Sequence, residues 1–177
     1  TTPNFANGVL KAIRESQVNC ENISNITHGM TVATNTALEM NGAKLGVITT
    51  RGFRDVLVVG RGNRTKLYNI KAVRPPPLVP RSRILEVNER ITAVGNIHIA
   101  LDEKQVIAAC LRLKELKVEA IAICFLHSYA NSTHERRATE IVQQELPGIP
   151  ISISSQILSE YREFERFSTT ALNAYVG

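Results

Sequence analysis

A short polar segment near the start of the sequence, His28 to Asn35 (HGMTVATN), carries residue types that can bind an anion. If a helix follows Gly29, Thr31, Thr34 and Asn35 lie on one face of it. Each of these side chains can donate to a ligand oxygen, and the free N–H groups of a helix start favour negative charge. We therefore expect a site for an anion at this helix start. The alternative is that Thr31 only caps the helix and that His28 is structural.

Charged residues follow two apolar runs that have the composition of buried strands. Arg51 and Arg54 come after residues 45–50, and His127 comes after residues 118–126. Open α/β sheets bind ligands at the carboxyl ends of their strands. The two arginines are therefore candidate anion ligands, and His127 is a candidate base or ligand. Two simpler explanations stay open: Arg54 pairs with the aspartate that follows it, and His127 caps a turn.

The end of the sequence predicts a helix that carries a row of hydrogen-bond donors. Arg162, Arg166, Thr169 and Asn173 are spaced so that a helix places them along one side. A solvated helix face usually carries lysine and glutamate, whereas this set is better suited to an anion or a partner. The alternative is an ordinary surface helix.

The order of the expected elements favours an α/β fold with a mixed sheet and flanking helices. Hydrophobic periodicity predicts helices at residues 5–17, at 31–41, after Asp102, after Ser132 and from about 159. Alternating or continuous apolar runs predict strands at residues 23–27, 45–50, 81–91, 95–99, 118–126 and 149–154. Asp102 with Gln105, and Ser132 with Glu135, each have the spacing of a capping box.

The composition indicates a cytoplasmic protein without a membrane-spanning segment. No apolar run approaches about 18 residues, and there is no secretory signal. The three cysteines, Cys20, Cys110 and Cys124, lack metal-binding or redox spacing, which favours reduced thiols. His134 and Glu135 are adjacent rather than arranged as HExxH, so the sequence predicts no metal site.

Basic residues are concentrated between Arg51 and Arg83. The net charge is +5, and residues 62–81 form an irregular basic arm that contains the proline run 75–77. A solvated arm is the simpler explanation, and an anion-facing loop is the alternative. Few aromatic side chains accompany the charges, so a nucleic-acid partner is not expected.

Four ordered stretches together resemble the N-terminal domain of the hydantoinase A and 5-oxoprolinase family. They are HGMTVATN (28–35), TTRGFRD (49–55), LHSY (126–129) with His134–Glu135, and YREFERFSTTALNAYV (161–176). The resemblance covers nearly all of the chain, residues 1–177, as one domain of this type. It implies an actin-like, sugar-kinase-like (ribonuclease H-like) ATPase fold. It also implies an ATP- and Mg²⁺-dependent hydrolase that opens 5-oxoproline or hydantoin-type rings.

The resemblance also implies that further segments of the same enzyme are needed for activity. Family members begin with an acidic, glycine- and threonine-rich phosphate loop, which we expect upstream of Thr1. The chain starts without a methionine and ends directly after a helical pattern, so we expect a fragment that is inactive alone. The main ATP and Mg²⁺ ligands are then expected outside it. A homo-oligomer or a second subunit is a further expectation.

An amide is a poor electrophile, so its oxygen must become a better leaving group, by phosphorylation for example, before water attacks. This chemistry needs donors for the oxygens and a base for the water. With the resemblance, His28, Asn35 and His127 become the catalytic candidates. Gly29, Thr31, Thr34, Arg51, Arg54 and the Arg162–Asn173 row become the binding candidates. Two rival functions stay open: a subunit of an ATP-dependent ketone carboxylase, and a non-catalytic module that binds through the basic arm.

Overall fold

The computed structural model describes residues 5–16, 24–25, 31–62, 68 and 76–177. They fall into two compact units, residues 1–31 and residues 32–177. In the first unit, helix α1 (Phe5–Glu15) confirms the helix expected at 5–17. Of the strand expected at 23–27, only Ser24 and Asn25 are described, and they do not belong to a strand.

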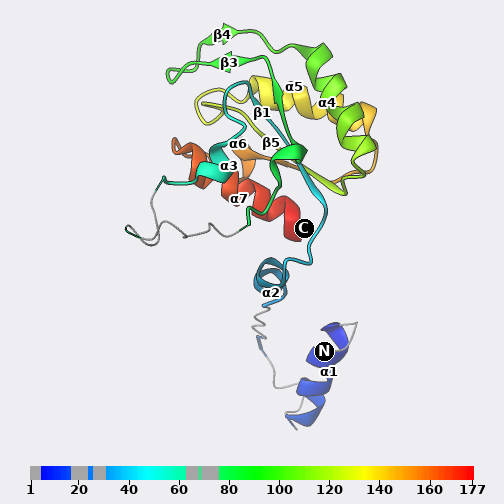
Figure 1. Cartoon of the computed structure of the whole chain (residues 1–177). Coiled ribbons are helices and arrows are strands. Elements are labelled where there is room, and N and C mark those ends of the chain that lie inside the picture. Colours follow the sequence, from blue (N-terminus) through cyan, green and yellow to red (C-terminus); the bar gives the residue numbers. More distant parts are fainter. Residues whose placement is uncertain (1–4, 17–23, 26–30, 63–67, 69–75) are drawn as a thin grey trace. The chain divides into compact units, whose positions relative to one another are not determined.

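The second unit is built on a four-stranded parallel sheet in the order β2-β1-β5-β6 (Figure 1). The strands are β1 (Leu45–Thr50), β2 (Ile84–Val87), β5 (Ala120–Cys124) and β6 (Ile151–Ile153). Val47 pairs with Ile84 on one side and with Ala122 on the other. The α/β class and the expected sheet are confirmed, and the antiparallel pairing forms a separate ribbon of β3 (Arg90–Ile91) and β4 (Ile97–Ile99).

Helices cover both faces of the sheet. Helices α4 (Glu103–Glu115) and α5 (Thr133–Glu145) pack on one face, and α7 (Glu163–Val176) packs on the other (Figure 1). Strand β5 shows why the faces differ. Ile121 and Ile123 point toward α4 and α5, whereas Ala120 and Ala122 let α7 lie close. Both sides of β5 are buried, as expected for a continuous apolar strand.

The shorter helices lie at the ends of strands. They are α2 (Val32–Glu39), α3 (Val56–Val59), the 3₁₀ turn η2 (Arg81–Arg83) and α6 (Ser154–Ile157). Helix α2 confirms the helix expected at 31–41. The last long helix begins at Glu163 rather than near residue 159.

The single strand expected at 81–91 is wrong. It divides at Asn88 and Glu89 into β2 and β3, which belong to different sheets. The start of α4 supplies the reason. The Asn88 N–H donates to the Gln105 side chain (2.9 Å), and the Asn88 carbonyl accepts from the Asp102 N–H (2.9 Å). A helix end thus takes the hydrogen bonds that a continuing strand would have used.

The two expected capping boxes have different outcomes. The Asp102 side chain does accept from the Gln105 N–H at 3.2 Å. The Ser132 side chain makes no capping bond, and Asn131 Oδ1 instead accepts from the Thr133 N–H (3.0 Å). The second capping box is therefore wrong, because Glu135 turns into the protein interior.

Only the two ends of the expected basic arm, residues 62–81, are described apart from Tyr68. At the second end of the arm, Val79 is fully buried in the core that α7 covers. Arg81 forms an ion pair with Asp55 (2.6 Å), so the partner of Asp55 is Arg81 rather than the neighbouring Arg54. Among the described helices, none is long and apolar enough to cross a membrane.

We expect Cys110 and Cys124 to react slowly with a thiol reagent in the native protein. Both are buried and free. Burial raises the pKa of the Cys110 thiol from 9.0 to about 11, and burial also raises the pKa of the Cys124 thiol. Because the thiolate is the reacting form, Cys110 should react roughly a hundredfold more slowly near neutral pH than a thiol with a pKa of 9.

The measurement is the release of thionitrobenzoate from Ellman's reagent by a Cys20→Ser variant, so that only the two buried thiols report. The rate should rise about tenfold per pH unit toward a pH of about 11, instead of levelling off near 9. Denaturant should make both thiols fast. Equal rates in the native and denatured proteins would contradict the expectation.

Candidate functional site

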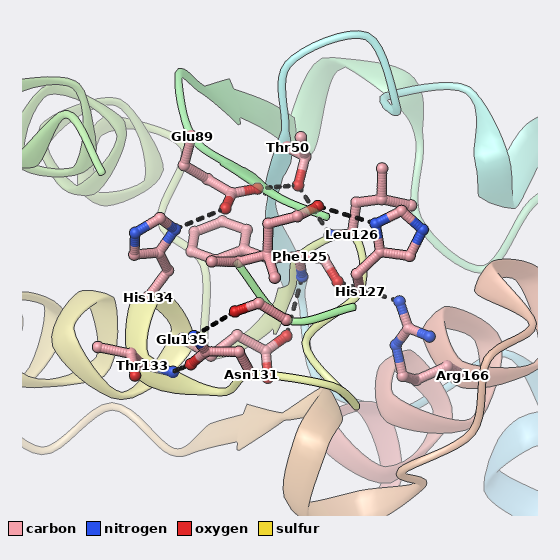
Figure 2. A network of polar contacts seen from close by, with 12 residues as sticks. Thr50, Glu89, Phe125, Leu126, His127, Asn131, Thr133, His134, Glu135 and Arg166 are labelled. Carbon is pink, nitrogen blue, oxygen red and sulfur yellow. Dashed lines mark hydrogen bonds and ion pairs between the residues drawn. The ribbon is translucent and has the colours of Figure 1, made fainter. Parts of the chain in front are cut away.

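Buried polar side chains gather where the parallel strands end, at the edge of the sheet where α/β folds place ligands (Figure 2). They come from the ends of β1, β5 and β6, from the β2–β3 loop and from helices α5 and α7. The members are Thr50, Glu89, Ser128, His134, Glu135, Ser154 and Arg166. Polar groups in such places must find partners, and their partners define two connected clusters.

The first cluster joins Thr50, Glu89 and His134. The Thr50 hydroxyl donates to one carboxylate oxygen of Glu89, and His134 Nδ1 donates to the other at 2.8 Å. Thr50 Oγ1 also accepts from the Leu126 N–H (2.8 Å), which ties the end of β1 to the end of β5. The carboxylate therefore fixes the orientation and the tautomer of His134.

The second cluster is centred on Glu135, near the start of α5. Its Oε1 accepts from the Phe125 N–H (2.8 Å) and from the Ser154 hydroxyl (2.6 Å), and its Oε2 accepts from the Ser155 N–H (2.9 Å). One carboxylate thus ties α5 to the ends of β5 and β6. Burial raises the pKa of Glu135, and the donors from Ser154, Phe125 and Ser155 oppose that shift.

Arg166 completes this cluster from the side of α7. It has no solvent exposure, and it donates to the Phe125 carbonyl (3.0 Å) and the Glu160 carbonyl (2.5 Å). Its guanidinium also lies over the rings of Tyr129 and Phe167, at 5.5 and 5.4 Å. Burial lowers the pKa of Arg166, and the nearby charge of Glu135 opposes this. Both charges therefore hold the segment that follows β5 in place.

That segment places His127 at the sheet edge in a left-handed backbone conformation (φ 56°). His127 Nδ1 lies 2.8 Å from the Ile91 carbonyl. Because a carbonyl only accepts, Nδ1 carries the proton, and Nε2 holds the lone pair in the neutral ring. No described residue bonds to Nε2. The geometry leaves His127 able to act as a base or ligand, and that role stays a prediction.

Arg51 and Arg54 follow β1 but differ in their partners. Arg51 is exposed, and its carbonyl accepts from Arg90 (3.2 Å). Arg54 donates twice to the Arg81 carbonyl, at 3.2 and 2.8 Å, and so holds the 3₁₀ turn in place. Arg51 is therefore the more accessible of the two cations, and anion binding by either one stays a prediction.

The residues expected around the first polar segment are only partly described. His28 and Gly29 lie outside the described residues. Thr31, Thr34 and Asn35 are exposed, the last two on α2. Their exposure leaves the three side chains accessible, and their part in a site stays a prediction.

The donor row expected on the last helix does not form one exposed face. Arg162 precedes α7 in an extended conformation and lies over Tyr161. Arg166 is buried, Thr169 is exposed, and Asn173 donates to Ser152 (3.0 Å). The expectation that Arg166 shares a solvent-facing row is wrong, because the end of β5 offers its guanidinium two carbonyls and two aromatic rings.

Several residues of the two clusters escape the sequence-based reasoning. Glu89 lies within the segment 81–91, whose composition predicts one long strand. Glu135 has the spacing of a capping box with Ser132, which predicts a local role at the helix start. A usable signal does exist: polar residues stand at the carboxyl ends of the strands, with Thr50 the last residue of β1, Ser128 four positions after β5 and Ser154 directly after β6. Polar residues at several strand ends, taken together, predict a cluster at one edge of a parallel sheet.

The described residues do not form a metal site made of protein side chains alone. No group of three possible ligands occurs among them, and the buried carboxylates of Glu89 and Glu135 direct their oxygens to protein donors. A nucleotide phosphate needs cations and donors, and the exposed side chains of Arg51, Thr34 and Asn35 are of this chemical kind. The structure does not bring them together, since Thr34 and Asn35 lie on α2 before β1 and Arg51 follows β1.

Comparison with known proteins gives concordant matches. The family described as the hydantoinase/oxoprolinase N-terminal region matches residues 1–146. Caprolactamase subunit alpha of Pseudomonas jessenii is 35% identical over 152 residues, covering 85% of this chain and 22% of that protein. The acetophenone carboxylase gamma subunit of Aromatoleum aromaticum is 33% identical over 164 residues, covering 85% and 22%.

A solved structure agrees with these matches. The crystal structure of the ATP-dependent caprolactamase from Pseudomonas jessenii superposes with a TM-score of 0.82 at 31% identity, covering 99% of this chain and 26% of that chain. The parallel sheet with flanking helices is thus shared with an ATP-dependent enzyme and agrees with an actin-like ATPase-type fold. The chain spans about a quarter of the length of the relatives it matches.

Proposed function

Because the chain belongs to the hydantoinase/oxoprolinase N-terminal family, we propose that it is part of an ATP-dependent enzyme that hydrolyses cyclic amides. The observation that carries the proposal is the match to an ATP-dependent caprolactamase in both sequence and fold. Other relatives named 5-oxoprolinase support the same class of reaction. Further segments or subunits of the enzyme are part of the proposal.

In this proposal, ATP supplies the activation that turns the amide oxygen into a leaving group. The chain's own residues bind the phosphate oxygens and orient the attacking water. Arg51, at the carboxyl end of β1, offers a cation to phosphate oxygens. Thr34 and Asn35, on α2 before that strand, are separate candidate donors, and His28 and Gly29 stay candidates from the sequence. His127, whose Nδ1 proton is held by Ile91, offers Nε2 as the base that positions water.

A second candidate function is a subunit of an ATP-dependent carboxylase. The match to an acetophenone carboxylase gamma subunit favours it, and so does the nucleotide-free acetone carboxylase structure, which superposes with a TM-score of 0.75. Both candidates share the use of ATP, and they differ in the molecule that stimulates its hydrolysis.

The test is ATP hydrolysis by the whole protein that carries this chain, with its copurifying subunits. We expect lactams or hydantoins to raise the rate of phosphate release and to yield the ring-opened amino acid. Ketones with bicarbonate serve as the matched alternative. Stimulation by a ketone only with bicarbonate, and by no cyclic amide, would replace the first proposal with the second.

A further inference from the structure

A polar cavity of about 350 Å³ opens beside the Glu135 cluster. The β3–β4 turn at Val94–Gly95 and the loop between β5 and α5 form its walls, and α6 adds Ser155. Its side chains that can form hydrogen bonds include Ser128, Tyr129, Ser132, Arg136, Ser155 and Ser159, and none of the described residues that line it is acidic. A cavity of this size is within the range of small-molecule sites.

Hydrogen-bond direction makes Ser128 an acceptor toward the cavity. The Ser154 hydroxyl donates its only hydrogen to Glu135 Oε1 at 2.6 Å. In the 2.9 Å contact between Ser128 and Ser154, the hydrogen must therefore come from Ser128. Ser128 Oγ has then used its hydrogen and can only accept from a further partner; the residue lines the cavity and is itself 2% exposed.

Other side chains that line the cavity can donate hydrogen bonds. The Arg136 guanidinium can only donate, and the hydroxyls of Ser132, Ser155 and Ser159 are able to donate. The cavity lining thus includes Ser128 Oγ as an acceptor and several groups that can donate. A ligand that matches it carries an N–H beside an oxygen that accepts hydrogen bonds.

The walls are held in place without a ligand. Glu135 accepts from the Ser155 N–H, and Asn131 donates to the Gly95 carbonyl (2.8 Å). Gly95 has a φ of 85°, and a side chain there would lie 3.2 Å from the Ala130 carbonyl oxygen, so a glycine permits this close approach. A preformed site loses less entropy when a ligand binds.

We propose that this cavity binds the cyclic amide, with Ser128 accepting the ring N–H and Arg136 donating to the carbonyl oxygen. The proposal rests on the proposed function for the class of ligand, and on the hydrogen-bond direction for its orientation. Ser128 and Arg136 are substrate-binding residues in this arrangement.

The test measures the Kd of ε-caprolactam and of N-methyl-ε-caprolactam by calorimetry or saturation-transfer NMR, with the whole protein and without ATP. We expect the wild type to bind the N-methyl compound at least about tenfold more weakly, because Ser128 loses its donor. Ser128→Ala should weaken lactam binding by a similar factor and should no longer distinguish the two compounds. Ser128→Ala leaves the Ser154–Glu135 bond intact, so its melting temperature should stay close to that of the wild type.

Arg136→Ala should also weaken binding by about tenfold. Arg137→Ala is the matched control, because Arg137 occupies the next position on α5 and pairs with Glu103 and Glu140 outside the cavity. Lactam binding that is absent at millimolar concentration, or equal in wild type, Ser128→Ala and Arg136→Ala, would overturn the proposal.

The two proposals fail differently. Ser128-dependent lactam binding without lactam-stimulated ATP hydrolysis would sink the proposed function and leave the cavity as a lactam site. Lactam-stimulated ATP hydrolysis with an unchanged KM in Ser128→Ala and Arg136→Ala would leave the function and overturn the cavity assignment.

Discussion

Replacing Arg166 by alanine is expected to lower the free energy of unfolding by about 3–5 kcal/mol. The guanidinium is fully buried and donates to the carbonyls of Phe125 and Glu160. Its removal leaves the buried Phe125 carbonyl without this donor and removes the positive charge near Glu135. The contacts with Tyr129 and Phe167 are lost as well.

Denaturation curves of the wild type and the variants measure this effect. Arg162→Ala is the matched control, since Arg162 is exposed and lies only over Tyr161, and its cost should stay within about 0.5 kcal/mol. Arg166→Lys should fall between the two because it keeps the charge but lacks the planar fork. Equal stability of Arg166→Ala and Arg162→Ala would show that the buried contacts contribute little.

Replacing Glu135 by alanine is expected to cost a similar amount, about 3–5 kcal/mol. Three donors lose their acceptor together: the Phe125 N–H, the Ser155 N–H and the Ser154 hydroxyl. Glu140→Ala is the control on the same helix, because Glu140 is exposed and its ion-pair partner among the described residues is Arg137. A loss in Glu135→Ala no larger than that in Glu140→Ala would contradict the central role of this carboxylate.

The stability of wild type relative to a Glu135→Gln variant depends on pH with a definite sign. Burial raises the pKa of Glu135 above the ordinary value of 4.5, with Arg166 and Cys124 as the ionisable groups that face it. The native state therefore holds the proton more tightly than the unfolded chain does. The stabilisation from this difference is complete below pH 4.5 and is lost as the pH rises through the native pKa. The stability of wild type relative to Glu135→Gln should fall over that range.

The sheet could be predicted from the sequence because its strands carry their own signal. Residues 45–50 and 118–126 are mostly apolar, with Thr49, Thr50 and Glu119 as the polar exceptions, and this is the pattern of a strand that is covered on both faces. The break at Asn88 has no such local signal. It depends on Gln105 and Asp102, which reach Asn88 only after α4 has packed beside β2.

The clusters at the strand ends were harder to predict, and the reason is again distance along the chain. Glu135 has the local spacing of a cap, yet its partners are Phe125 and the Ser154–Ser155 pair. The helical spacing places Arg166 on the side opposite the apolar face, which predicts a solvent-facing side chain. Its acceptor, the Phe125 carbonyl, is 41 positions earlier in the sequence. Local patterns predict the elements, whereas polar partners depend on the tertiary arrangement.

The strand order has a consequence for synthesis on the ribosome. Strand β1 is made early, but its neighbour β5 follows about 75 residues later, the separation between Thr49 and its acceptor Cys124. The apolar side chains of Leu45 and Val47 are covered only when α7 has also emerged. Non-local pairing of this kind folds slowly and exposes apolar segments meanwhile. A nascent chain therefore offers β1 to chaperones that bind extended apolar peptides until nearly all of this unit has been translated.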